Sequence, residues 1–115
     1  VVLAENAEGR FLLQQRPGKG LLAGLWQPLL WEGEALSAGE VLARLEELGL
    51  GCAGAEALPE AKHIFSHIEW RMKGYAVRVG AAPAPAGCVW ASREQMQDEY
   101  TLPGAFKAYK KRMGL

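Results

Sequence analysis

A long alternating run between Ile68 and Val79 dominates the secondary-structure pattern of this chain. Apolar and charged side chains alternate there with a period of two, which is the period of a β-strand with one buried face. The alternation shifts by one residue at Gly74, so we expect a β-bulge at that position. The apolar members of the run are Ile68, Trp70, Met72, Tyr75, Val77 and Val79.

A second extended segment, residues 61–65, precedes this run, and the tripeptide Phe65-Ser66-His67 lies where the two segments meet. Such a tip offers an aromatic ring, a hydroxyl that can donate and accept, and an imidazole. A protein can inspect one base of a nucleic acid with groups of these kinds. The alternative is that Phe65 is a core residue, Ser66 a turn residue and His67 a hydrogen-bonded strand residue, since short motifs often occur by chance.

The amino-terminal part of the chain has the pattern of a β-hairpin. Two apolar runs, residues 1–4 and 10–16, are joined by a turn-rich spacer that ends in Gly9. A third extended segment, residues 26–31, contains Pro28. Because proline lacks an N–H donor, this segment is expected at a sheet edge or at a bulge.

One helix is predicted between Ser37 and Gly49. Ser37 is a candidate N-cap, and Glu40, three residues later, would complete a capping box. Apolar residues then recur at helical spacing, and Gly49 is a candidate C-cap residue. The small residues of 51–60 are expected to form a linker before the next strand.

The carboxy-terminal part is expected to contain a short strand at residues 88–91, a helical turn capped by Ser92 and a final amphipathic helix that begins at Leu102-Pro103. Strands that surround a central helix and end in a terminal helix predict an α/β (α+β) fold in layers. The length of 115 residues suits one domain, residues 1–115.

Charge and cysteine content exclude some classes of protein. The net charge is zero, but residues 9–31 carry only positive charges and residues 32–60 are mainly acidic. A neutral protein with this asymmetry can present a cationic face to phosphate, although it can equally be an ordinary solvated surface. Cys52 and Cys88 have no Cys-x-x-Cys partner, which argues against a zinc site or a disulfide framework. No apolar run is long enough for a membrane span, and no segment has the pattern of a signal peptide.

The order of hairpin, Gly-Leu-Trp strand and acidic helix ending in Glu-Glu-Leu-Gly resembles the Nudix fold, a mixed β-sheet packed between helices. In Nudix hydrolases this helix carries an Arg-Glu pair and a Glu-Glu pair, and its glutamates hold a divalent metal against a pyrophosphate. Here Glu46 and Glu47 match the second pair, but Leu42 and Ala43 occupy the positions of the first. The resemblance therefore implies a structural helix, with no metal site and no catalytic residues.

A narrower resemblance, across nearly the whole chain, is to the carboxy-terminal domain of the MutY family of adenine DNA glycosylases. It implies a DNA-repair domain that reads 8-oxoguanine opposite adenine, while excision belongs to an amino-terminal catalytic domain with a [4Fe-4S] cluster. This chain would then hold no cofactor and would not be an enzyme by itself. The motifs that carry the resemblance are Gln14-Gln15-Arg16-Pro17, Gly20-Leu21-Leu22-Ala23-Gly24-Leu25-Trp26, His63-x-Phe65-Ser66-His67 and Leu102-Pro103-x-Ala105-Phe106.

The resemblance implies that Ser66 makes the hydrogen bond to the oxidised base and that Phe65 and His67 shape the loop around this base. His67 could instead be hydrogen-bonded within the fold. Candidates for contacts to phosphate are the basic side chains near this tip and near the Gly-rich block. These candidates are Arg16, Lys19, Lys62 and His63.

The expected partners are duplex DNA containing 8-oxoguanine and the amino-terminal catalytic domain of the same chain. The abrupt start at Val1, without an initiator Met, suggests a piece of a longer protein. We expect a monomer in the cytoplasm of a bacterium, associated with the nucleoid when on DNA. Two alternatives are a Nudix hydrolase of oxidised nucleoside triphosphates and an interaction module that docks a partner through exposed Leu21, Leu22 and Trp26.

Overall fold

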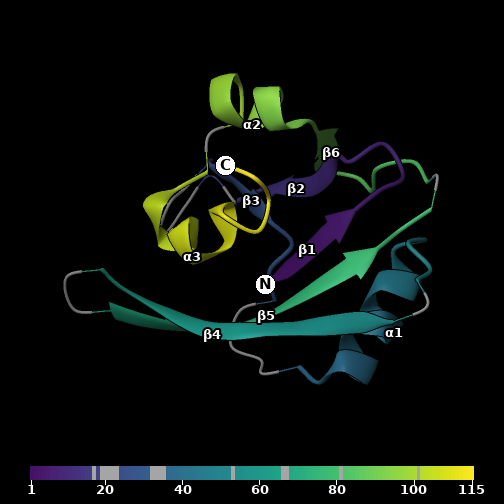
Figure 1. The fold of residues 1–115 in the computed structure, drawn as a ribbon, viewed down its shortest axis with the longest axis horizontal. Helices are drawn as coiled ribbons and strands as arrows, with labels where there is room; N and C mark the ends of the chain where they lie inside the picture. The colour runs from purple at the N-terminus through teal and green to yellow at the C-terminus, as the bar shows by residue number, and fades with distance from the viewer. Residues whose placement is uncertain are drawn as a thin grey trace.

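The structure, a computed structural model, describes residues 1–16, 18, 24–31, 36–52, 54–65, 68–80, 82–100 and 102–115. Six strands and a few short helices follow one another along the chain (Figure 1). The strands are β1 (Val2–Glu5), β2 (Phe11–Gln15), β3 (Trp26–Pro28), β4 (Ala55–Phe65), β5 (Ile68–Arg78) and β6 (Cys88–Ala91). The helices are α1 (Ala38–Glu47), α2 (Arg93–Asp98), the 3₁₀ helix η1 (Gly104–Phe106) and α3 (Lys107–Lys110).

The strands form a mixed sheet in the order β3-β2-β1-β5-β4, and β6 pairs with β2 outside this path. β1 runs parallel to β5, with Val2 opposite Tyr75, whereas the other strand pairs are antiparallel. The predicted hairpin of β1 and β2 is confirmed. Pro28 lies in β3 at one end of the path, which confirms the expected edge position and explains why the missing N–H is tolerated.

Helices cover both faces of the sheet, as the predicted layered fold requires. On one face, Val41 and Leu45 of α1 pack in a cluster with Tyr75 and Val77 of β5. On the other face, η1 and α3 contribute Phe106 and Tyr109 to a second cluster that includes Leu13 and Met72. The first cluster packs the buried face of α1 against the sheet, and the second packs the carboxy-terminal segment against it.

Helix α1 begins and ends as predicted. The Ser37 hydroxyl accepts a hydrogen bond from the Glu40 amide at 3.3 Å, and the Glu40 carboxylate accepts one from the Ser37 amide at 3.1 Å. These backbone and side-chain contacts lower the pKa of the Glu40 carboxyl. Gly49 follows the C-cap residue Leu48 with φ of 78°, a left-handed conformation that glycine adopts without strain.

The expectation of a linker at residues 51–60 is wrong, because β4 begins at Ala55. Alanine and glutamate favour strands only weakly, so the local sequence gave no sign of one. Pairing with β5 supplies the stabilisation instead, since Ala55 lies opposite Val77 and Ala57 opposite Tyr75.

The expected bulge at Gly74 in β5 is also misplaced. β5 alternates regularly, with Met72 facing one core cluster and Tyr75 and Val77 facing the other. The register shift lies in β4, between Leu58 and Ala61. The apolar pattern changes phase because the buried side chains lie on one face of the strand up to Met72 and on the opposite face from Tyr75 onwards. The backbone itself does not bulge there.

The final helix is interrupted, in contrast to the continuous helix expected from Leu102-Pro103. Pro103 is the N-cap of η1 and lies before the first turn, and α3 begins only at Lys107. Gly104 has a weak helical preference, which is consistent with a short 3₁₀ start. None of the helices described is long and apolar enough to cross a membrane.

Candidate nucleic-acid interface

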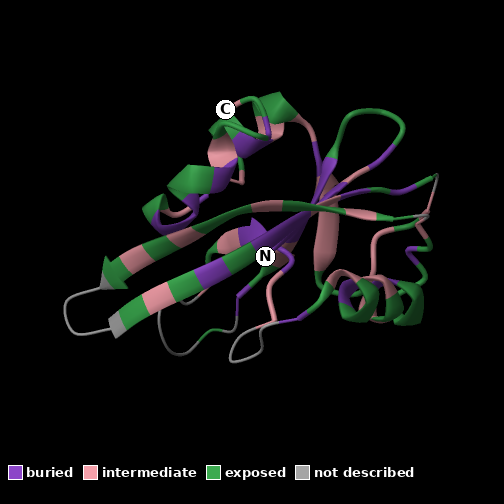
Figure 2. Cartoon of the chain, turned by 60° about the horizontal axis from the view of Figure 1, so that its bottom comes forward, coloured by how far each residue is buried: buried purple, intermediate pink, exposed green. Residues whose placement is uncertain are grey.

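The β4–β5 hairpin is the most extended feature of the molecule (Figure 1). Each of its strands has 11 residues. At about 3.4 Å per residue such a strand is about 37 Å long. The longest dimension of the molecule is 39 Å. The hairpin therefore reaches nearly across the protein, and its far end projects beyond the helices (Figures 1 and 2).

One face of the hairpin is anchored on the carboxy-terminal helices. Trp70 makes an edge contact with Phe106, with ring centroids 6.1 Å apart. The Tyr109 hydroxyl donates a hydrogen bond to the carbonyl of Met72 at 3.4 Å. Burial, and secondarily the charge of Glu60, raises the pKa of Tyr109. These contacts hold the hairpin from one side and fix its direction.

Gly74 lies on the anchored face, directly below the ring of Tyr109. A Cβ atom at this position would lie 2.5 Å from Cε1 of that ring, which is closer than real Cβ contacts. Glycine is required here by close packing and not by an unusual backbone angle.

Arg16, a predicted phosphate contact, is instead part of the packing under the hairpin. Its side chain is buried, and Nη1 donates a hydrogen bond to Oε1 of Gln27 at 2.8 Å. The guanidinium lies 5.1 Å from the ring centroid of Trp70, a distance typical of a cation–π contact. A phosphate contact would require Arg16 to leave this buried position, so we assign it a structural role.

Trp26, which begins β3 directly after the Gly-rich loop, is likewise not the exposed docking residue that one alternative required. It is half-buried, and its ring lies 4.9 Å from that of Tyr100 in an edge arrangement. The other two residues of that alternative, Leu21 and Leu22, lie outside the described residues. The one exposed large apolar residue described in this loop is Leu25, which is 43% exposed.

Two further predicted phosphate contacts, Lys62 and His63, are neighbours in β4 and therefore face opposite sides of the hairpin. Lys62 is exposed and lies directly opposite Arg71 of β5. His63 is half-buried and lies opposite Trp70, on the anchored face. The structure thus separates the two candidates and places Lys62 on the uncovered side.

In the sequence, the predicted base-reading segment joins the two strands of the hairpin. Phe65 is the last residue of β4 and pairs with Ile68, the first residue of β5. Ser66 and His67 lie outside the described residues, as does Lys19. Their roles, and the role of the Phe65 side chain, remain predictions.

The helix α1 does not offer the ligands of a Nudix metal site. Glu46 and Glu47 are exposed near its carboxy-terminal end, whereas half-buried Leu42 and exposed Ala43 occupy the positions of the missing Arg-Glu pair. Across the described ranges, no group of three or more His, Cys, Asp and Glu side chains is placed to hold a metal ion. The donor set therefore does not fit the metal that the fold family implies.

The two cysteines do not fit an iron–sulfur cluster, which takes four thiolate ligands. Cys52 and Cys88 are both half-buried and free of disulfide bonds. Burial raises the pKa of both thiols, so they stay protonated near neutral pH. Two thiols therefore cannot supply the ligands of such a cluster, and the cluster implied by the resemblance stays a prediction for a separate catalytic domain.

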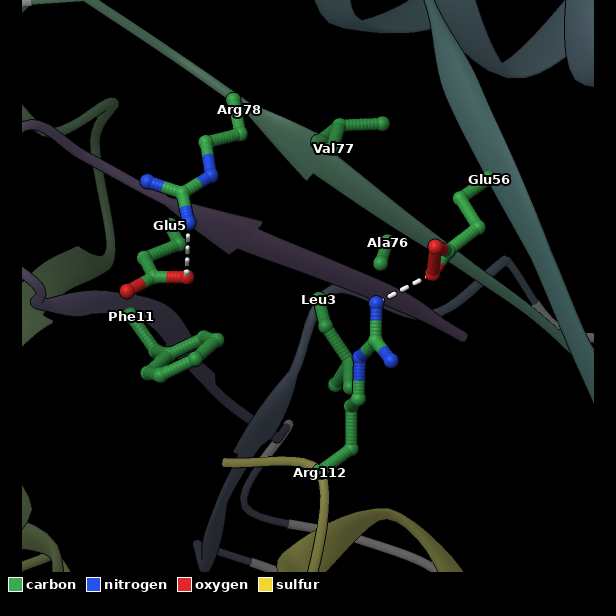
Figure 3. A pocket seen from close by; sticks show the side chains of 8 residues that line it. All are labelled: Leu3, Glu5, Phe11, Glu56, Ala76, Val77, Arg78 and Arg112. Carbon is green, nitrogen blue, oxygen red and sulfur yellow. Dashed lines mark hydrogen bonds and ion pairs between the residues drawn. The ribbon is translucent and has the colours of Figure 1, made fainter. Parts of the chain in front are cut away.

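A second polar region was not foreseen from the sequence. A hollow of about 300 Å³ lies between β1, the carboxy-terminal end of β5 and the carboxy-terminal segment of the chain (Figure 3). Arg78 lies 3.9 Å from Glu5, and Arg112 forms an ion pair with Glu56 (Figure 3). Because each guanidinium faces a carboxylate, the charges of this hollow are balanced. The sequence holds no local signal for the first pair, because Glu5 lies opposite Arg78 only through the parallel register of β1 and β5.

The fold agrees with the comparison to known proteins. The chain belongs to the NUDIX domain family, whose model matches residues 1–112. Among curated proteins it is similar to the adenine DNA glycosylase of Mus musculus, with 38% identity over 92 residues, and to that of Homo sapiens, with 35% identity over 95 residues. The matched parts cover 73% and 75% of this chain but only 18% and 17% of those relatives.

Solved structures give the same relationship. The C-terminal domain of mouse MUTYH, described in complex with human PCNA, superposes with a TM-score of 0.73 and 29% identity, covering 98% of this chain and 83% of that one. A MutT protein from Methanosarcina mazei Go1 has a TM-score of 0.60 and 21% identity, covering 98% of this chain and 88% of that one. The second likeness shows the shared fold alone. The expected Nudix-like fold, and the resemblance to the carboxy-terminal domain of adenine DNA glycosylases, are confirmed.

Proposed function

We propose that this chain is the lesion-recognition domain of an adenine DNA glycosylase and that the tip of the β4–β5 hairpin reads 8-oxoguanine in duplex DNA. The observation that carries the proposal is the hairpin itself. Two 11-residue strands that are anchored on one face end at Phe65 and begin at Ile68, and Ser66-His67 joins them in the sequence. The similarity to adenine DNA glycosylases over about three quarters of the chain supplies the chemical context.

The proposed reading depends on how oxidation changes the edge of guanine. In guanine, N7 accepts a hydrogen bond. Oxidation at C8 makes N7 a donor and adds a carbonyl oxygen beside it. The Ser66 hydroxyl can accept from N7–H and at the same time donate to a nearby oxygen, whereas against normal guanine it would have to turn and use its proton on N7, so that one of the two contacts is lost. The paired contacts thus favour the oxidised base over guanine.

Excision of adenine would come from a different part of a longer protein. This chain spans less than a fifth of the length of the curated relatives it matches. In our proposal a catalytic domain with an iron–sulfur cluster removes adenine, and the present domain directs it to 8-oxoguanine:adenine mispairs. The role of the whole protein would then be base excision repair of DNA.

Hydrolysis of an oxidised nucleoside triphosphate is the main competing activity for a NUDIX domain. We infer that this chain lacks it, because Leu42 and Ala43 replace the leading pair of charged residues on α1. A pyrophosphatase assay with 8-oxo-dGTP and Mg²⁺ tests this directly. Metal-dependent release of pyrophosphate by the pure protein would overturn the assignment.

The decisive variant is Ser66→Ala. We expect it to lose roughly 1–3 kcal/mol of the preference for an 8-oxoguanine:adenine duplex over a guanine:adenine duplex, because one base-specific contact disappears. Fluorescence anisotropy with the two duplexes at one low salt concentration measures this difference.

The matched control is Ser37→Ala, which makes the same chemical change at the N-cap of α1. It should lower stability by about 1 kcal/mol and leave the preference between the duplexes unchanged. An unaltered preference in Ser66→Ala would exclude the hydroxyl as the reader of the lesion.

A further inference from the structure

The uncovered face of the β4–β5 hairpin differs from the anchored face in charge and exposure. Lys62 and Arg71 are exposed and lie directly opposite each other on neighbouring strands. Like charges in this position destabilise an antiparallel pair. Exposed Lys73 and exposed Ile64 extend the same face along the hairpin. We name this surface the hairpin face and define it by Lys62, Ile64, Glu69, Arg71 and Lys73.

The hairpin face is hollowed as well as charged. A groove of about 580 Å³ runs over it. Figure 2 shows this outer part of the hairpin projecting beyond α1, so none of the helices in the described part of the chain covers it there. The groove is lined by Glu60, Ala61, Lys62, Glu69, Arg71, Met72 and Lys73.

Glu69, the acidic residue of the hairpin face, is a weakly held counterion. Arg71 lies 3.5 Å from Glu69, and the two side chains are 85% and 39% exposed. An exposed ion pair of this kind contributes little, so a phosphate group can replace the Glu69 carboxylate. The ammonium of Lys73 lies 5.9 Å from the ring centroid of Tyr75, which keeps it on the same side of the strand.

We propose that the hairpin face lies along one phosphate backbone of duplex DNA, with Lys62, Arg71 and Lys73 as the phosphate contacts. Arg71 and Lys73 are separated by one residue on the same face, about 6.8 Å along the strand, and can contact separate phosphates. Ile64, which is 61% exposed and nearer the tip, contacts the sugars. Glu69 competes with phosphate for Arg71 and limits the affinity.

This inference rests on the proposed function, because it extends the contact at the hairpin tip along the strands. The two ideas predict different behaviour. A phosphate contact adds affinity for every sequence, whereas the tip discriminates between bases. The hairpin face therefore supplies affinity and orientation, and Ser66 supplies selectivity.

The test measures binding of the protein to 8-oxoguanine:adenine and guanine:adenine duplexes by anisotropy, from about 20 to about 200 mM salt. Arg71→Gln and Lys62→Gln should each weaken binding to both duplexes equally, on the order of tenfold at about 50 mM salt, and lower the salt slope by about one. Glu69→Gln should strengthen binding to both by roughly threefold, because it removes the competing carboxylate.

The matched control is Arg10→Gln, an exposed cation in the loop between β1 and β2, which lies away from the hairpin tip (Figure 1). It should change neither the affinity nor the slope. Wild-type affinity and slope in Arg71→Gln and Lys62→Gln would overturn the inference, as would a protein that binds neither duplex at the lowest salt. If the charge variants behave as expected while wild-type protein shows no preference for 8-oxoguanine, the proposed function fails and the phosphate contacts stand.

Discussion

At the scale of single residues, the structure separates side chains that the sequence makes look equivalent. Arg16 and Lys62 are both cations near the candidate site. Arg16 is buried against Gln27 and Trp70, whereas Lys62 is exposed on the hairpin face. A sequence shows which residues are basic, but their burial in the structure decides which of them can contact phosphate.

Gly74 gives a residue-scale prediction about stability. Gly74→Ala should lower the free energy of unfolding by about 1–3 kcal/mol, because the new methyl group overlaps the Tyr109 ring. Denaturant unfolding measures the loss. Gly80→Ala is the control, since a Cβ there meets no atom within 4 Å.

A second variant tests the cause of that loss. Adding Tyr109→Ala to Gly74→Ala should cost less than the sum of the two single changes, since the clash disappears with the ring. Strict additivity would show that the glycine is needed for some other reason.

At the scale of elements, the position of the hairpin depends on its docking to the carboxy-terminal helices. Tyr109 of α3 covers Gly74 and donates to the Met72 carbonyl, and Phe106 of η1 contacts Trp70. These helices have only three and four residues, so packing must stabilise them. The hairpin and the short helices therefore stabilise each other.

The raised pKa of Tyr109 makes this docking sensitive to alkaline pH. The folded state holds the phenol proton more tightly than the unfolded state, whose pKa is about 10. The contribution of Tyr109 to stability should be complete below pH 10 and should be lost as pH rises from there through the folded pKa.

Unfolding experiments on wild-type protein and Tyr109→Phe across this range provide the measurement. At neutral pH the variant should be less stable by about 1 kcal/mol, because a hydrogen bond is lost. The difference should shrink above pH 10, since phenylalanine has no proton to lose. Curves that remain parallel to high pH would contradict the assignment of this titration to Tyr109.

At the scale of the whole molecule, the sequence predicted those parts of the fold that have a local chemical signature. The cap at Ser37, the terminating Gly49 and the edge position of Pro28 each follow from one residue's hydrogen bonding or backbone preference, and all three were correct. The first half of β4 was missed because its strand is stabilised by β5 and not by its own residues. The bulge was misplaced because β5 has two buried faces.

The candidate site was predictable to a similar extent. The motif Phe65-Ser66-His67 located the end of the hairpin, because a tripeptide between two strands can be recognised from the order of the residues alone. The cross-strand position of Lys62 opposite Arg71 could not be predicted, since cross-strand neighbours depend on the register of the two strands. The charge-balanced hollow around Glu5 and Arg78 also depends on register, in this case that of two parallel strands.

The parallel pairing of β1 with β5 has a consequence for how the protein is made. Val2 has Tyr75 as its partner, so this pairing of β1 must wait during translation until some seventy further residues have been synthesised. During that interval β1 (Val2–Glu5) can pair with β2 but leaves its other edge open, and an open apolar strand edge is a hazard for aggregation. Slow or interrupted translation before β5 should therefore reduce the yield of native protein more than a delay after it.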